Sequence, residues 1–387
     1  MVLVPTMEVI YSDVCLLHNP PTQIRNGTAT VHPECPDRLR SIKKYIDEHA
    51  EFSVLSSRDY TLIPILAVHQ PDFLDFLQTI YKQWVDEGLS EDAVMGEVFA
   101  HPTLIQHLGN QWQKNAQTSA SARFGQYVFD MSVLIMKDTW TSTYESAQIV
   151  LTGAHQLLRQ VESNKQQPAS VYAVCRPPGH HAAGNMAGGF CFINNVAVAA
   201  RFLQNYTLQD MDRFIEKGEL SASQNDKKKV LIVDIDYHHG NGTQTIFYDD
   251  ASVFYISLHC SPDYPYFTGS AAEIGIGPGE GYNINIPLPK TTTDAEYLNA
   301  LSGVLNRSDV VKFGAEYVIC SLGLDTWHED PIAGMKLEDL ATYHQMGNLF
   351  KTSESCKGRP VLFVQEGGYA VSKLGELVGK VLTGYLS

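Results

Sequence analysis

Two aspartates and a histidine follow an apolar run in the segment VLIVDIDYHHGNG, residues 230–242. Because side chains alternate along a strand, Asp234, Asp236 and His238 point to one side, and Asp236 and His238 can reach one ion together. Asp325 ends another apolar run and can supply a third ligand. Two carboxylates and an imidazole leave zinc an open position for water and a substrate oxygen, although iron and manganese accept the same ligands.

Two further motifs carry groups that can move a proton or stabilise an oxyanion. The segment RPPGHHAAG places His180 and His181 after a rigid turn, where one imidazole can act as a base and the other as its electrostatic partner. Tyr369 follows two glycines in QEGGY and can donate a hydrogen bond to a tetrahedral oxyanion. For any one of these residues a structural role is the better interpretation, but together they favour a catalytic metal site.

These residues end strand-like segments that alternate with helix-like segments. Short apolar runs predict strands at residues 7–12, 170–179, 229–237, 252–259, 315–325 and 359–368. Helices are predicted over residues 191–206, 295–311 and 337–352. Strands that are apolar on both faces and alternate with helices predict an α/β fold with a mainly parallel sheet, and such sheets bind ligands at the carboxyl ends of their strands.

We expect a single domain over residues 1–387, without internal repeats, and three surface excursions. Residues 18–36 are rich in Pro, Asn and Thr, residues 108–125 are small and polar, and the lysines of residues 218–229 indicate a solvated linker. The first two excursions flank sheet elements and are candidates for the rim of a pocket.

Composition restricts the class of protein. Hydrophobic residues make up 44% and charged residues 18% of the chain, which indicates a globular protein with ample core. The formal net charge of -15 disfavours a nucleic-acid binder and suits a cationic substrate. The seven cysteines form no CxxC pair, which indicates a reducing compartment. Without a signal-peptide pattern or an apolar run of roughly 20 residues, we expect a soluble, cytoplasmic protein with no membrane partner.

The assembled motifs resemble those of the zinc-dependent histone deacetylase and acetylpolyamine amidohydrolase superfamily. From about residue 140 onward the blocks run in the family's order: RPPGHHAAGNMAGGFCFINNVAVAA, VDIDYHHGNGTQTIFYDD, ISLHCSPDYPYFTGSAAEIG, GEGYNINIPLP, SLGLDTWHEDPI and FVQEGGYA. The resemblance implies a three-layer arginase-deacetylase-like fold, in which a mainly parallel sheet of about eight strands has helices on both faces. It implies one zinc ion on Asp236, His238 and Asp325.

The resemblance also implies roles for the residues around the zinc. His181 is expected to act as general base and acid, His180 as its electrostatic partner, and Tyr369 to polarise the acetyl carbonyl. Asp234 is expected to bond to His180. Asn241 is expected to face His181 where some members have an aspartate, and an amide would not make His181 more basic as a carboxylate would.

Further residues follow from the same resemblance. The family carries two monovalent cation sites for K+ or Na+. The first would use Asp234, Asp236, His238, Ser257 and Leu258, and the second Phe247, Asp250, Val253 and Tyr282. Phe190 and Phe267 are expected to line the tunnel for the acyl-linked chain, with Gly189, Gly367 and Gly368 bordering the substrate. We expect Cys191, beside Phe190, to be a packed thiol.

The activity that the resemblance implies is removal of an acetyl group from an N-acetylated primary amine. The catalytic blocks are most similar to those of acetylpolyamine amidohydrolases, which recognise a distal cationic nitrogen with acidic residues on early loops, one of them across a dimer interface. Here the first loop, LLHNPPTQIRNG, and residues 101–129 contain no acid, and VHPECPDRLRSI is more similar to protein lysine deacetylases. We therefore place an acetylpolyamine slightly ahead of an acetyl-lysine peptide, with a homodimer as one possible assembly.

Two alternatives to this enzyme are weaker. A catalytically silent relative that binds acetylated amines would have lost a metal ligand, a base histidine or the tyrosine, and all of these are present. A binuclear ureohydrolase of the same fold would need more carboxylates than the segments HHGN and GLDT offer.

Overall fold

The computed structural model describes residues 6–25, 27–163, 169–221 and 227–387, and its centre is an eight-stranded sheet. Every pairing in the sheet is parallel, and the strand order is β4-β1-β5-β10-β9-β6-β7-β8. The strands are β1 (Met7–Tyr11), β4 (Phe52–Ser56), β5 (Ser170–Ala173), β6 (Val230–Asp234), β7 (Val253–Cys260), β8 (Asn283–Leu288), β9 (Tyr317–Leu322) and β10 (Val361–Gln365). The central strands β5, β6, β9 and β10 are buried at every residue, as a parallel sheet covered on both faces requires.

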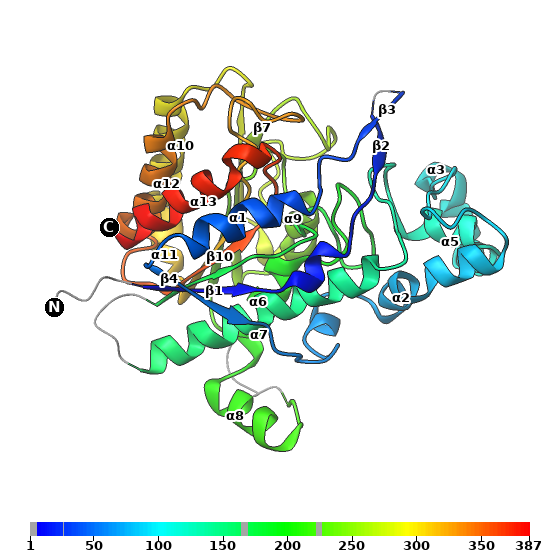
Figure 1. Ribbon diagram of the computed structural model, residues 1–387, viewed down its shortest axis with the longest axis horizontal. Coiled ribbons are helices and arrows are strands. Elements are labelled where there is room, and N and C mark those ends of the chain that lie inside the picture. The colour runs from blue at the N-terminus through cyan, green and yellow to red at the C-terminus, as the bar shows by residue number, and fades with distance from the viewer. Residues whose placement is uncertain (1–5, 26, 164–168, 222–226) are drawn as a thin grey trace.

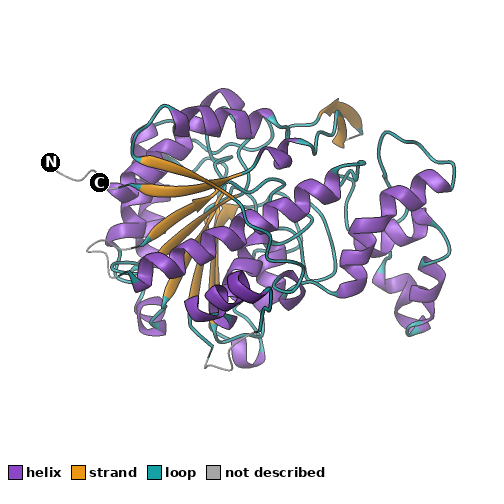
Figure 2. Ribbon diagram, turned by 60° about the horizontal axis from the view of Figure 1, so that its bottom comes forward, coloured by secondary structure: helices purple, strands orange, loops and turns teal. Residues whose placement is uncertain are grey.

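Helices cover both faces of the sheet, which confirms the predicted three-layer α/β fold (Figures 1 and 2). One face carries α1 (Asp37–Asp47), α10 (Asp294–Leu305), α12 (Leu340–Thr352) and α13 (Val371–Leu386), with the short α11 (Ser308–Phe313) next to α10. The other carries α6 (Thr139–Glu162), α7 (Asn195–Asn205), α8 (Leu208–Lys217) and α9 (Asn241–Phe247). No described helix combines the length and apolar character that a membrane crossing requires.

The sheet brings four functional loops together. Strands β5, β10, β9 and β6 are consecutive neighbours and parallel, so their carboxyl ends meet at one edge of the sheet. The segments that follow them are residues 174–181, 366–370, 323–333 and 235–242, respectively. Groups that lie far apart in the sequence therefore converge at this edge.

A group of helices extends beyond one side of the sheet and corrects one prediction (Figure 2). It contains α2 (Pro71–Asp86), α3 (Pro102–Ile105), α4 (Gln111–Ala116) and α5 (Ala120–Tyr127). Residues 108–125 were expected to be an irregular excursion, but most of them are helical. Ser119 caps α5 by accepting a hydrogen bond from Ala122 N, and Phe124 is buried within it. A polar composition hides a helix here because the polar residues provide its cap and outer face.

Other predicted boundaries also differ from the structure. Residues 18–36 contain an antiparallel hairpin, β2 (Thr22–Arg25) and β3 (Thr28–Val31), which lies apart from the main sheet (Figure 1). The helix predicted over residues 295–311 is two helices, α10 and α11. Within the predicted linker 218–229, residues 222–226 lie outside the described residues. Short 3-10 helices lie at Asp13–Leu16, Ile65–Ala67, Gln106–Leu108 and Gly277–Gly279.

Candidate active site

Two carboxylates and one imidazole converge where β6 and β9 end. The possible ligand atoms of Asp236, His238 and Asp325 all lie within 4.8 Å of one another, and all three residues are buried. His238 Nδ1 lies 2.9 Å from Asp325 Oδ2 and 3.3 Å from Asp236 Oδ1. The predicted ligands are therefore brought together by two neighbouring strands.

The hydrogen bonding of this cluster fits a metal ion. Asp325 Oδ1 accepts a hydrogen bond from Tyr237 N at 2.9 Å, but its buried Oδ2 makes no well-aligned hydrogen bond to any described residue, although His238 Nδ1 lies 2.9 Å away. A buried carboxylate oxygen without a donor is costly unless a cation faces it. Burial alone would lower the pKa of His238, but Asp236 and Asp325 raise it to about 10, so the two carboxylates favour positive charge at this point.

The two histidines of the Pro-Pro-Gly turn have different hydrogen-bond partners. His180 Nδ1 lies 3.1 Å from Asp234 Oδ2, and His181 Nδ1 donates to Asn241 Oδ1 at 2.7 Å. Burial would lower the pKa of His180, but Asp236 and Asp234 raise it to about 10. Burial, together with the charges of His180 and His238, holds the pKa of His181 well below its usual range. The pair thus combines an imidazolium with a neutral imidazole whose Nε2 is free to accept a proton.

One cavity joins the histidine turn, the cluster and the tyrosine. His181, His238 and Tyr369 all line it, together with Gly189, Phe190 and Tyr264. Burial raises the pKa of Tyr369 well above its usual range, which keeps the phenol protonated and able to donate a hydrogen bond. The Arg38 guanidinium lies 4.8 Å from the centre of the Tyr369 ring and the Phe190 ring packs on it edge-on at 5.8 Å. The reactive groups therefore share one cavity with aromatic walls.

Glycines allow the chain to approach these side chains closely. Gly189 has φ +55°, and a Cβ there would lie 2.3 Å from His181 Cδ2. Gly189 borders the cavity, as predicted for a residue next to the substrate. Gly367 and Gly368 do not line it; a Cβ on Gly367 would lie 2.5 Å from Asp236 Oδ2, and Gly368 O accepts a hydrogen bond from Arg38 Nε. These two glycines serve the metal cluster and its support rather than the substrate.

The prediction that Phe267 lines the tunnel is wrong for this structure. Its side chain is 94% exposed and lies outside the cavity wall. Tyr264 takes that position: its ring packs edge-on against His181 at 5.0 Å, and its hydroxyl donates to Asp130 Oδ2 at 2.5 Å. The segment offers several aromatic residues, and a tertiary hydrogen bond, which the sequence does not reveal, selects the one that turns inward.

The residues predicted for the monovalent cation sites lie close to one another in two groups. Asp234 and Ser257 are partners in the β6–β7 register, next to Leu258 and the metal cluster. In the second group, Asp250 N donates to Phe247 O and Val253 N to Asp250 O, while Tyr282 O accepts from Tyr255 N. The Asp250 carboxylate pairs with Arg201 at 2.6 Å. Occupancy of either site by K+ or Na+ stays a prediction.

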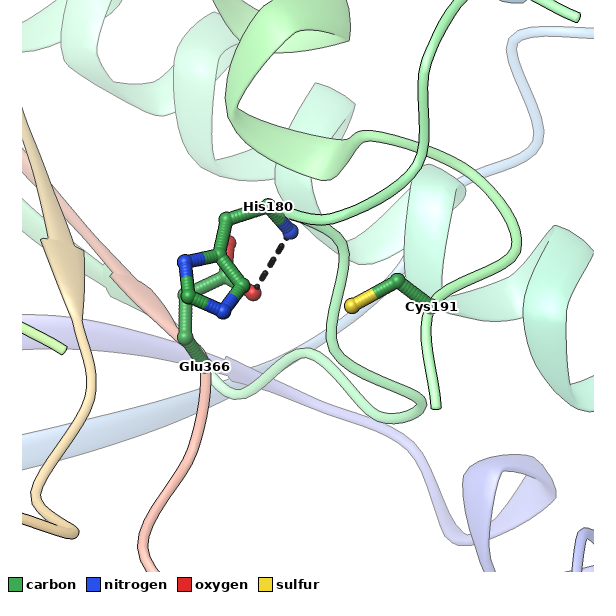
Figure 3. A group of neighbouring side chains, drawn as sticks. All are labelled: His180, Cys191 and Glu366. Atoms are coloured by element: carbon green, nitrogen blue, oxygen red, sulfur yellow. Dashed lines mark hydrogen bonds between the residues drawn. The ribbon is translucent and has the colours of Figure 1, made fainter. Parts of the chain in front are cut away.

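A second cluster of possible metal ligands lies directly behind the histidine turn. It contains His180, Cys191 and Glu366, and Figure 3 shows the Cys191 sulfur pointing toward the other two. Glu366 Oε2 accepts hydrogen bonds from Gly179 N and His180 N, and Cys191 Sγ donates to Gly189 O at 3.3 Å. Burial raises the pKa of the Cys191 thiol well above its usual range. These atoms are already satisfied, so the cluster fits a packed polar core better than a metal ion.

Besides Tyr264, several charged residues of the site were not predicted from the sequence. Asp130 and Asp263 contribute carboxylates to the cavity wall, and Arg25, on the hairpin, lies at its rim and donates to Ile332 O at 2.8 Å. Glu366 and Asp330 bind backbone N–H groups behind the site. Each is a single charged residue without a motif of its own. The one available signal was that Asp263, Asp330 and Glu366 lie within the blocks ISLHCSPDYPYFTGSAAEIG, SLGLDTWHEDPI and FVQEGGYA.

The fold and the cavity define a class of protein: a parallel α/β protein with a buried cluster of possible metal ligands and a pair of buried histidines at the carboxyl edge of its sheet. Comparison with known protein families narrows this class, because the histone deacetylase domain family matches residues 32–385. The chain belongs to this family and is a deacetylase, which is a hydrolase.

Relatives with known names cover nearly the whole chain. Acetylpolyamine amidohydrolase 2 of Pseudomonas aeruginosa is 36% identical over 98% of each chain, and acetylpolyamine amidohydrolase of Mycoplana ramosa is 33% identical over 98% of this chain and 99% of its own. Human histone deacetylase 9 is 38% identical over 95% of this chain, but only 32% of its own length is matched. The crystal structure of an acetylpolyamine aminohydrolase from Burkholderia pseudomallei has a TM-score of 0.81 at 28% identity, with 98% of each chain covered.

Proposed function

We propose that this protein is a zinc-dependent deacetylase that releases acetate from an N-acetylated primary amine, with an acetylpolyamine as the favoured substrate. The single observation that carries the proposal is the shared cavity, into which His181, His238 and Tyr369 all open beside the cluster of possible metal ligands. The donor set of two carboxylates and an imidazole, together with the unpaired Asp325 Oδ2, suits zinc with an open position. When bound, zinc would polarise the acetyl carbonyl and lower the pKa of a water molecule.

The chain's own residues supply the proton transfers. His181, neutral and fixed by Asn241, takes a proton from the attacking water at Nε2 as the water oxygen adds to the carbonyl carbon. The same nitrogen then gives that proton to the leaving amine as the C–N bond breaks, and acetate remains. His180, charged and paired with Asp234, lies against His181 with ring centres 4.0 Å apart and opposes a second full charge on it.

The remaining residues stabilise the oxyanion and exclude water. Tyr369 donates a hydrogen bond to the carbonyl oxygen as it becomes negative, at a point that burial shields from solvent. The rings of Phe190 and Tyr264 both border the cavity and give it aromatic walls that suit an alkyl chain. This arrangement favours a primary amine on a flexible chain over a bulky amide.

Charge around the cavity supports a cationic substrate. Asp130 and Asp263 both contribute to its wall, and the chain carries a net charge of -15. The relatives named acetylpolyamine amidohydrolases support the same assignment. An acetyl-lysine peptide is the second candidate, because Arg25 at the rim would repel a distal ammonium group and suits a peptide backbone carbonyl instead.

A competition experiment tests the proposal. The zinc-loaded enzyme is given N-acetylputrescine, N-acetylspermidine and an acetyl-lysine peptide under identical conditions, and kcat/KM is compared. We expect acetate release from all acetylated amines that fit the cavity, with kcat/KM at least about tenfold higher for an acetylpolyamine, a difference of about 1.4 kcal/mol. A preference for the peptide would move the protein to the second candidate. Absence of acetate release from all three, with one zinc bound per chain, would contradict the proposed reaction.

A further inference from the structure

The two backbone turns that present the base histidine and the tyrosine are each held by a buried carboxylate outside the metal cluster. We propose that Glu366 and Asp330 are positioning residues for the deacetylation reaction, the first for the His180–His181 turn and the second for Tyr369. This inference rests on the proposed function, because it assumes that His181 and Tyr369 act on the substrate.

Glu366 holds the histidine turn through its main chain. Its Oε2 accepts hydrogen bonds from Gly179 N at 2.6 Å and from His180 N at 3.1 Å, and the second of these is drawn in Figure 3. Its Oε1 accepts a hydrogen bond from Ser321 Oγ on β9 at 3.2 Å. The carboxylate is completely buried. It thus ties the residue before His181 to the central strand of the sheet.

Asp330 holds the tyrosine in the same manner. Its Oδ2 accepts hydrogen bonds from Tyr369 N at 2.7 Å and from Ala370 N at 3.2 Å. Its Oδ1 accepts from Ile332 N at 3.1 Å and from Ala333 N at 3.2 Å, which anchors the acceptor in its own loop. Only 7% of Asp330 is exposed. A single oxygen therefore fixes the main chain at the tyrosine itself.

The position of these turns matters because both groups must act on one acetyl group, His181 on the attacking water and Tyr369 on the carbonyl oxygen. A shift of about 1 Å in a catalytic group can lower the rate about 100-fold without loss of folding. Neither carboxylate lines the cavity, so neither contacts the substrate directly. Loss of either anchor should therefore lower kcat with little change in KM or in zinc content.

The two carboxylates differ in a way that amide substitutions reveal. Glu366 uses one oxygen for both backbone N–H groups, and its other oxygen faces a hydroxyl that can also accept a hydrogen bond. Gln at this position keeps all three contacts. Asp330 uses both oxygens as acceptors for four N–H groups, and Asn has one acceptor oxygen and one NH2 group that would face two N–H donors. We therefore expect E366Q to retain activity and D330N to lose much of it.

The test compares E366A, E366Q, D330A and D330N, each as the zinc-loaded full chain, on whichever acetylated amine the wild type hydrolyses. We expect kcat to fall about 100-fold in both alanine variants, about 30-fold in D330N and less than about fivefold in E366Q, with KM within about threefold throughout. E273A is the matched control: Glu273 also accepts backbone N–H groups, from Gly269 and Ser270, but in a loop that carries neither catalytic group. Its kcat should stay within about threefold of wild type.

Hydrogen exchange supplies a readout that does not depend on turnover. Peptides covering residues 176–182 should exchange faster in E366A, and those covering residues 367–372 in D330A, with each effect confined to its own turn. Hydrogen exchange distinguishes failure of the proposed function from failure of this inference. If the wild type has no activity, the proposed function is contradicted, but the exchange rates still show whether Glu366 and Asp330 hold the two turns.

Several results would overturn the inference. The inference is wrong if both alanine variants keep kcat within about threefold of wild type, or if E366Q is as slow as E366A. It is also wrong if activity falls only in proportion to the zinc that a variant loses. If an alanine variant does not fold, the amide pair decides: E366Q at least about fivefold faster than D330N supports the inference, and equal rates contradict it.

Discussion

Two buried clusters of metal-capable side chains lie side by side in this protein, and their hydrogen bonding separates them. In the first cluster, Asp236, His238 and Asp325, one carboxylate oxygen makes no well-aligned hydrogen bond to any described residue, and its close polar neighbour is the His238 imidazole, itself a possible metal ligand. In the second, His180, Cys191 and Glu366, each side chain already has a hydrogen-bond partner. Similar residue types and similar burial therefore lead to different functions.

The comparison shows that residue types alone do not define a metal site. A cation replaces hydrogen-bond donors, so it belongs where acceptors face one another without them. The second cluster instead uses its carboxylate to accept backbone N–H groups, which a metal ion would displace. The first cluster therefore fits an ion better than the second, whose hydrogen bonds hold the chain beside it.

The largest expected effect is the loss of zinc binding when one ligand of the first cluster is changed. Asp325→Asn keeps the hydrogen bond from Tyr237 N but removes the charge that a metal ion would meet. Because losing an outer-shell partner alone costs about 10–100-fold in metal affinity, losing a ligand charge should cost more than about 100-fold. Zinc content after dialysis, measured by atomic absorption, should fall from one per chain to near zero, and activity with it.

The control for that variant is Asp263→Asn, which makes the same change at a carboxylate in the wall of the same cavity. It should retain one zinc per chain. Equal zinc content in the two variants would show that Asp325 is not a ligand and would remove the distinction between the clusters.

The next effect tests the Tyr369 hydroxyl, which is proposed to donate to the substrate oxyanion and lines the same cavity as His238. Tyr369→Phe removes only the hydroxyl, and losing one oxyanion donor typically lowers kcat by about 100–1,000-fold. Zinc content should not change. Tyr264→Phe removes a hydroxyl from another wall of the cavity, where it bonds to Asp130 rather than to the substrate, and should lower kcat less than about tenfold. Near-normal turnover of Tyr369→Phe would contradict its assignment.

A smaller effect concerns the pH dependence of stability in the second cluster. Burial raises the pKa of Glu366 from its ordinary value of 4.5 to about 7. The folded protein thus keeps this proton up to about pH 7 whereas the unfolded chain releases it near 4.5, so the group's contribution to stability falls as pH rises between these values. Oε2 accepts the two N–H groups in either state.

The measurement compares the free energy of unfolding of wild type and Glu366→Gln at pH 5 and pH 8.5. Gln cannot titrate, so the wild type should lose up to about 3 kcal/mol relative to the variant between these two values. A pH-independent difference between the two chains would show that Glu366 stays in one protonation state over this range and would contradict its raised pKa.

Much of the fold could be predicted from the sequence, and the strands that were not predicted share a physical cause. The strands predicted from apolar runs are the buried central ones and their neighbours. The edge strands were missed: β4 is mostly exposed, and the buried Asn283 and Asn285 of β8 bind Gln244 rather than showing an apolar pattern. Edge strands bury less surface, so their sequences carry a weaker hydrophobic signal.

The residues of the candidate site also fall into a group that the sequence could predict and a group that it could not. Residues at the ends of predicted strands could be assigned to one edge, because parallel strands bring their carboxyl ends together. Tyr264, Asp330 and Glu366 could not, because each acts through a partner that only the tertiary structure brings near. The homodimer and the monovalent cations stay predictions.

The smallest expected effect comes from removing the sulfur of the second cluster, which tests whether that cluster binds a metal ion. The Cys191 thiol donates to Gly189 O, and burial raises the pKa of this thiol, so it offers no thiolate to a metal ion. Cys191→Ala should therefore bind one zinc per chain with unchanged affinity and keep kcat within about threefold of wild type. Titration of the metal-free proteins with zinc makes the distinction: one equivalent in wild type and in Cys191→Ala places the ion in the first cluster alone, whereas a second equivalent that disappears with the sulfur would show that both clusters bind metal.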